Sequence, residues 1–148
     1  MEKLPAERII VGIDGSASSR AAIDWTLKRA SKGDTLVLIH AWRLPAVSGL
    51  EMPVASLADF EAAAHRLVKE TVEELDIDAE TGPTVETIVA AGHAGPALIE
   101  AAQGADLIVV GSRGYGGLRG ILLGSVSTYV IHHAQCPVAV IPTPEEDE

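Results

Sequence analysis

Residues 107–127 read LIVVGSRGYGGLRGILLGSVS, and the fold is decided in this stretch. It opens with an apolar run, Leu107–Val110, continues with six glycines between Gly111 and Gly124, and closes where a helix is expected to begin at Gly124–Ser125. Glycine loses more backbone freedom on folding than other residues, so this density needs a physical reason. A glycine-rich loop that leaves a strand and enters a helix is typical of a place where a ligand approaches the main chain.

The rest of the chain repeats the alternation of strand and helix. Helical periodicity is found over 18–30, over 57–75, in a segment with Pro96 in its first turn that ends near Gly104, and from Gly124–Ser125 to about His133. The other apolar runs are Ile9–Ile13, Thr35–Ala41, Thr84–Val89 and Val138–Ile141. Because these runs are almost continuously apolar, they indicate strands covered on both faces. The sequence predicts an α/β fold, a doubly wound, Rossmann-like, five-stranded parallel sheet with helices on both faces.

Local signals set the expected helix boundaries. In the first helix, Ala22, Ile23 and Thr26 fall on one stripe that should face the core, and Gly33 is placed to stop the helix. Ser56, with Asp59 three residues later, resembles a capping box and predicts the start of the second helix there.

Composition limits the class of protein. A length of 148 residues predicts one domain, residues 1–148, that ends in an acidic tail over 143–148. The formal net charge of −10 argues against nucleic acid and anionic membranes as partners. With no signal peptide and no apolar run of membrane-spanning length, we expect a cytoplasmic protein. The single cysteine, Cys136, cannot form a disulfide within the chain and is interpreted as a packed thiol.

The glycine-rich segment favours phosphate binding. Backbone N–H groups in such a loop, followed by a helix N-terminus, form a concave site for anions, and Ser125 and Ser127 add hydroxyl donors. The alternative is a flexible loop in which Ser125 acts only as a helix cap. The lysine-containing phosphate loop of energy-transducing NTPases is absent, and Gly12–Ser16 lacks the dinucleotide-binding pattern of glycines.

These residues resemble the universal stress protein family. The ATP-binding branch of that family carries G-x2-G-x9-G-[ST] after its fourth strand, and Gly111, Gly114, Gly124 and Ser125 match it completely. The segment 11–16, VGIDGS, and the segment 133–138, HAQCPV, also fit the family. The resemblance covers roughly residues 6–142, which we take as the domain core.

The resemblance implies a strand order of 3-2-1-4-5 and a homodimer. It also implies an adenine nucleotide: ATP, with ADP and AMP as alternatives, bound with Mg²⁺ or Mn²⁺ at the phosphates. Asp14 would lie beside the adenosine, Ala41 would line the adenine pocket, and Val110 and Gly111 would border the adenosine. The phosphates would be held by Gly114, Gly124, Ser125, Val126 and Ser127. Gly12 and Ala41 replace larger family residues, Pro and Val, which leaves the resident nucleotide open.

Several residues have two interpretations. Asp14 could contact the nucleotide or cap the following helix. Arg113 and Arg119 are the cations of the loop, and Arg113 is a candidate phosphate ligand. Trp42 follows Ala41 and could reach the nucleotide or serve packing. The segment Leu44–Ala55 is either a functional loop or a tolerated insertion. Neither a catalytic set nor a histidine metal site is expected.

Three functions fit this pattern. The first is a nucleotide-dependent regulatory protein that responds to stress, forms a homodimer through strand 5 at residues 137–142, and acts on an unknown protein partner. The second is a slow ATP hydrolase, although no residue spacing demands one. The third is an interaction module that has kept the fold and lost the ligand.

Overall fold

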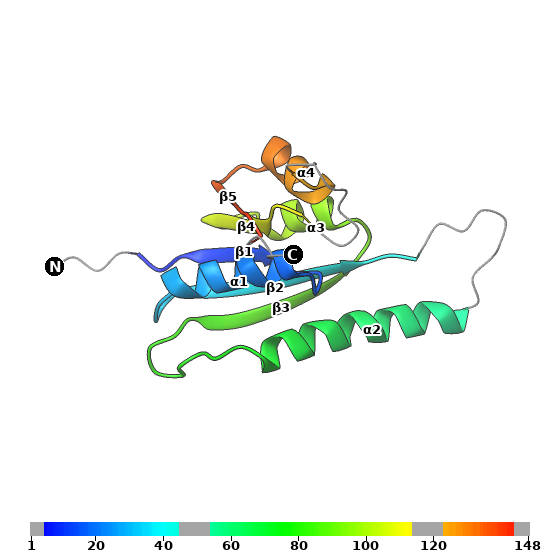
Figure 1. Cartoon of the computed structure of the whole chain (residues 1–148), viewed down its shortest axis with the longest axis horizontal. Coiled ribbons are helices and arrows are strands. Elements are labelled where there is room, and N and C mark those ends of the chain that lie inside the picture. Colours follow the sequence, from blue (N-terminus) through cyan, green and yellow to red (C-terminus); the bar gives the residue numbers. More distant parts are fainter. Residues whose placement is uncertain (1–4, 45–53, 114–122, 144–148) are drawn as a thin grey trace, which may run out of the picture.

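The computed structural model describes residues 5–44, 54–113 and 123–143, which form alternating strands and helices (Figure 1). The elements in chain order are β1 (Arg8–Gly12), α1 (Ala17–Arg29), β2 (Thr35–Trp42), α2 (Val54–Glu73), β3 (Thr84–Ala91), α3 (Ala94–Ala101), β4 (Leu107–Gly111), α4 (Ser125–His133) and β5 (Val138–Ile141).

The five strands form one parallel sheet in the order β3-β2-β1-β4-β5, so the predicted fold is confirmed. Strand β1 lies at the centre, where Ile9 pairs with Leu36 of β2 and with Leu107 of β4. From β1 the sheet is built outward in both directions: β2 and then β3 are added on one side, and β4 and then β5 on the other. The carboxyl ends of β1 and β4 therefore flank the switch point at which open α/β sheets bind ligands.

Two apolar layers cover the two faces of the sheet. Helices α1 and α2 pack on one face, where Val11, Ile23 and Leu38 are buried. Helices α3 and α4 pack on the other, where Ile10 and Leu98 are buried (Figure 1). Burial on both faces explains why the strands are continuously apolar. The predicted inner stripe of α1 is confirmed, since Ala22, Ile23 and Thr26 are at most 1% exposed.

Two boundary predictions were wrong. Helix α2 begins at Val54, so Ser56 and Asp59 lie within its first turns instead of starting it. Helix α1 ends at Arg29 with an extended C-cap residue, Ala30, before Gly33 is reached. Gly33 instead adopts a φ of +100° in the turn that leads to β2. Its neighbour Asp34 holds that turn, because its carboxylate accepts a hydrogen bond from the backbone N–H of Ser31 at 2.9 Å.

Among the described residues, no helix combines the length and the apolar character needed to cross a membrane.

Candidate functional site

A cavity of about 470 Å³ opens at the carboxyl ends of the strands, on the face covered by α3 and α4. Its walls come from the end of β2, the turn after β3, the first turn of α3 and the start of α4. The lining residues are Ala41, Arg43, Gly92, His93, Ala94, Gly95, Pro96, Ser125, Val126 and Tyr129. A volume of this size suits a small organic ligand.

Three of the predicted site residues line this cavity: Ala41, Ser125 and Val126. Ala41 lies there because side chains alternate along β2. Val37 and Ile39 belong to the apolar layer under α3 and α4, so Ala41 faces the same side. A small residue at the strand end leaves space that a larger side chain would fill. The structure therefore brings the end of β2 and the start of α4 to one cavity, although they are far apart in sequence.

The start of α4 offers uncapped backbone donors. Its N-cap is Gly124, which has no side chain that could accept a hydrogen bond from the first turn. Gly124 itself is held by its N–H, which donates to the carbonyl of Ser112 at 2.6 Å. Ser125 is exposed beside this end. The hydroxyl of Ser127 is 3.0 Å from the carbonyl oxygen of Gly124 and donates to it, and the residue is 1% exposed.

Gly111 is required by close packing against the start of α1. A Cβ atom on Gly111 would lie 2.1 Å from Ser18 Oγ and 2.6 Å from the Ser18 carbonyl oxygen. The same Ser18 hydroxyl accepts a hydrogen bond from the backbone N–H of Arg113 at 3.1 Å. The first residues of the glycine-rich segment are therefore fastened to α1. Gly114 and Arg119 lie outside the described residues.

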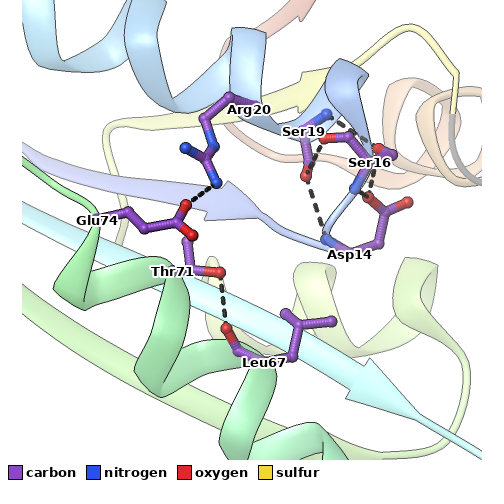
Figure 2. Close-up of polar contacts among 7 residues, drawn as sticks. All are labelled: Asp14, Ser16, Ser19, Arg20, Leu67, Thr71 and Glu74. Carbon is purple, nitrogen blue, oxygen red and sulfur yellow. Dashed lines mark hydrogen bonds and ion pairs between the residues drawn. The ribbon is translucent and has the colours of Figure 1, made fainter.

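Asp14 supports the start of α1 (Figure 2). Its Oδ1 accepts hydrogen bonds from the backbone N–H of Ser16 at 2.9 Å and from the Ser16 hydroxyl at 2.5 Å. Ser16 is the N-cap, and its side chain accepts from the N–H of Ser19 at 3.1 Å. The alternative interpretation, in which Asp14 itself caps α1, was thus wrong. The N-cap is Ser16, two residues later, and the Asp14 carboxylate holds that residue in place. Its half-buried carboxylate still lies at the carboxyl end of β1.

His40 connects the ends of β1 and β2 next to Asp14. Its Nδ1 is 2.8 Å from the carbonyl oxygen of Ile13, which can only accept, so Nδ1 carries the proton in this contact. The backbone N–H of Ile13 also donates to the carbonyl of Ile39 at 2.9 Å. These two bonds fix the backbone from which Asp14 projects.

Gly12 and Val110 lie below the cavity. A Cβ on Gly12 would lie 3.1 Å from Leu98 Cδ1 and 3.6 Å from Val110 Cγ1. Val110 is 3% exposed and belongs to the apolar layer under α3 and α4. Neither residue is part of the cavity lining. The small residue at position 12 leaves room for Leu98 of α3 to pack against β1.

Sequence reasoning missed the part of the wall made by Arg43, Gly92, Gly95 and Tyr129, and it considered His93 only as a candidate for hydrolysis. One signal was available, because Arg43 and His93 each follow a strand that ends at the ligand-binding edge of the sheet. Tyr129 could not have been found this way, since its place depends on how α3 and α4 pack together.

Metal ligands are sparse in this part of the molecule. Across residues 5–44, 54–113 and 123–143, no group of three or more His, Cys, Asp or Glu side chains is placed to hold a metal ion.

Cys136, half-buried before β5, is poorly suited to act as a nucleophile. Burial raises the pKa of its thiol above the ordinary value of 9.0, and the nearby charge of Asp106 raises it further.

The structure is a doubly wound α/β domain with a cavity at the edge of the sheet where the strands have their carboxyl ends. The universal stress protein family model matches residues 5–142, so the chain belongs to the universal stress protein family.

Relatives and solved structures agree with this membership. A universal stress protein from Mycolicibacterium smegmatis is 37% identical over 138 residues, which is 90% of this chain and 47% of that protein. The chain thus spans about half the length of the curated relatives it matches. Universal stress protein UspA from Lactobacillus plantarum is 25% identical, with a TM-score of 0.70, and the match covers 94% of this chain and 99% of that one. A universal stress protein solved in complex with cAMP is 26% identical, with a TM-score of 0.57 and coverage of 95% and 100%.

Proposed function

We propose that this chain is a nucleotide-dependent regulatory protein that binds an adenine nucleotide, ATP in the first place, at the edge cavity. The observation that carries the proposal is the shared cavity of Ala41, Ser125 and Val126. It joins a small apolar floor to the uncapped start of a helix, which suits a ligand with a flat base at one end and phosphates at the other. The cAMP complex of a related universal stress protein supports an adenine ligand.

The phosphates would lie at the first turn of α4. Backbone N–H groups there have no side-chain cap, and the exposed hydroxyl of Ser125 adds a donor. Gly114 of the matched motif, with Arg113 as the cation, would complete the contacts from the loop side. A negative phosphate is favoured at this helix end by the helix dipole, by about 0.3–1 kcal/mol.

The residues present suit a metal that travels with the phosphates. Mg²⁺ prefers oxygen ligands and keeps several waters, so it would be held by the phosphate oxygens of the nucleotide together with one or two oxygen atoms of the protein. Ser125 is the candidate hydroxyl, and Asp14 at the end of β1 is the candidate outer carboxylate. Such an ion would neutralise phosphate charge in an acidic protein of net charge −10.

Binding, and not hydrolysis, is the function that the cavity favours. The described lining holds no carboxylate that could orient an attacking water, and nothing in the placement of Asp14, outside that lining, or of His93, within it, demands hydrolysis. The proposal includes a cytoplasmic location, a homodimer through β5, and a protein partner that responds to the nucleotide state.

Calorimetric titration with ATP and Mg²⁺ tests the proposal. Replacement of Ala41 by Phe fills the cavity floor, and we expect it to weaken ATP binding at least about tenfold, because one aromatic ring occupies the volume of the base. Ala62→Phe is the matched control, since Ala62 is exposed on α2. Nucleotide released from purified, denatured protein should be identified by chromatography beforehand. Absence of bound nucleotide together with absence of ATP binding by the unmodified protein would refute the proposal.

A further inference from the structure

Arg43 and His93 come together at the rim of the cavity from two neighbouring strands. Strands β2 and β3 are paired up to Trp42 and Ala91, and the N–H of Gly92 donates to the carbonyl of Trp42 at 2.7 Å. Both rim residues therefore follow directly after this paired end. They lie on the β2–β3 side of the cavity, whereas Ser125 enters from the start of α4 after β4.

Neither side chain is used to hold the described structure. Within residues 5–44, 54–113 and 123–143, Arg43 and His93 form no side-chain hydrogen bond or ion pair, and both are exposed. Two other arginines do form ion pairs: Arg8 pairs with Glu86, and Arg20 pairs with Glu74. Two polar groups that border a ligand-sized cavity without protein partners are available to a bound molecule.

The position of His93 is unfavourable for the helix that follows it. His93 is the N-cap of α3, but its side chain makes no capping hydrogen bond. In α1 the corresponding place is held by Ser16, which caps through its side chain. A residue that caps poorly makes the helix less stable than Ser, Thr, Asp or Asn would at the same position. Gly92, with a φ of +120°, turns the chain so that His93 reaches the cavity wall.

The chemistry of this wall suits the base of a nucleotide. A guanidinium plane can stack on a purine ring or donate to its ring nitrogens, and imidazole can both donate to and accept from a base edge. The apolar groups beside them, Ala41 and the ring of Tyr129, suit the face of a flat base. We infer that Arg43 and His93 contact the base of the bound nucleotide and set the base-dependent part of its affinity. This inference rests on the proposed function and assigns one end of the same site.

Calorimetry with two ligands separates contacts to the base from contacts to phosphate. ATP carries both groups, whereas inorganic tripolyphosphate carries phosphates alone. For Arg43→Ala and His93→Ala we expect ATP affinity to fall about tenfold each, as loss of one good polar contact does, with tripolyphosphate affinity changed less than about twofold. His93→Gln should restore part of the ATP affinity, because its amide also donates and accepts. Ser125→Ala should weaken both ligands.

Arg66→Ala and His65→Ala are the matched controls, since both residues lie on α2, away from the cavity lining. Unchanged ATP binding by both rim variants would overturn the inference while leaving the proposed function in place. Equal loss of ATP and tripolyphosphate affinity would also overturn it, since Arg43 and His93 would then serve the phosphates. Failure of the unmodified protein to bind ATP would overturn both proposals together.

Discussion

Single residues in this fold often serve packing where the sequence alone favours a ligand. Gly111 matches a phosphate-binding motif, yet its lack of a side chain is required by packing, because a Cβ atom there would lie 2.1 Å from Ser18 Oγ. Asp14 matches a nucleotide-contacting position, yet it also holds the N-cap Ser16. Gly111 and Ser18 are far apart in the sequence, and the contact of Asp14 with Ser16 depends on the conformation of the turn between them. Neither residue spacing nor composition could therefore reveal these contacts. Ala41 and Ser125, in contrast, both line the cavity, as the family resemblance implied for Ala41 and as the glycine-rich segment before a helix start predicted for Ser125.

Gly111→Ala should destabilise the protein more than an alanine placed at an open glycine. The added methyl group would collide with backbone as well as side-chain atoms of Ser18, so α1 must shift, and we expect a loss of about 3 kcal/mol. Gly104→Ala is the control, because a Cβ there meets nothing within 4 Å and only its φ of +78° is strained, at about 1 kcal/mol. Urea denaturation measures both. Equal losses in the free energy of unfolding for the two variants would contradict this prediction, because they would show that α1 can shift away from residue 111 at little cost.

Cys136 should react slowly with alkylating reagents at neutral pH. Burial, and after it the charge of Asp106, raise the thiol pKa above 9.0, so the reactive thiolate is scarcer than in a free cysteine. The folded state also keeps this proton to higher pH than the unfolded state, so stability from this group decreases as pH rises past 9.0. Iodoacetamide rates measured against glutathione between pH 7 and pH 10 provide the test. Alkylation as fast as that of glutathione at about pH 7.5 would contradict the expectation.

At the scale of elements, the sequence predicted which segments form strands and which form helices, but it did not predict the residues at which every element begins and ends. Apolar runs and helical stripes depend on local sequence, so all nine elements of the described part of the chain follow from it. The signals at Ser56 and Gly33, in contrast, did not give the start of α2 at Val54 or the end of α1 at Arg29. The packing of α3 on α4 is also tertiary: a Cβ on buried Gly95 would lie 2.6 Å from Tyr129 Cδ1. This close contact fixes the Tyr129 ring, which also stacks on His133 with centroids 4.0 Å apart.

Gly95→Ala should separate α3 from α4 and lower the free energy of unfolding by about 1–3 kcal/mol, as overpacking does. The cost should be smaller in a Tyr129→Ala background, because most of the atoms that collide belong to the ring. A double-mutant cycle followed by thermal denaturation measures this coupling. Additive effects of the two substitutions would mean that the helices do not press on each other at this point.

At the scale of the whole molecule, the strand order is confirmed, and β5 forms the edge of the sheet through which the proposed homodimer would pair. The N–H groups of Ile108 and Ser112 donate to the carbonyls of Pro137 and Ile141, so odd-numbered residues of β5 face β4. Backbone groups of Val138 and Val140 then face outward by alternation. An apolar edge of this kind can pair with a second copy of the chain. The cavity itself was only partly predictable, because its walls come from four segments that are separate in the sequence: the end of β2, the turn after β3, the first turn of α3 and the start of α4.

Light scattering tests the dimer expected at β5. The unmodified protein should have twice the chain mass of 15.4 kDa at micromolar concentration. Val140→Pro removes an outward N–H while leaving the bonds to β4, and should shift the mass toward the monomer. Val140→Ala is the matched control, since it loses the same side-chain packing but keeps the N–H. A monomeric unmodified protein would refute the interface.

The central place of β1 has a consequence for protein synthesis. Of the five strands, β1 leaves the ribosome first, but one of its two partners, β4, begins only at Leu107. Until then, one edge of this central strand stays unpaired, and the emerging chain exposes that edge to chaperones and proteases. The cavity closes later still, when α4 is made. Under the proposed function, nucleotide binding would therefore mark a chain whose synthesis has passed α4, and protection by the ligand could begin only at that stage.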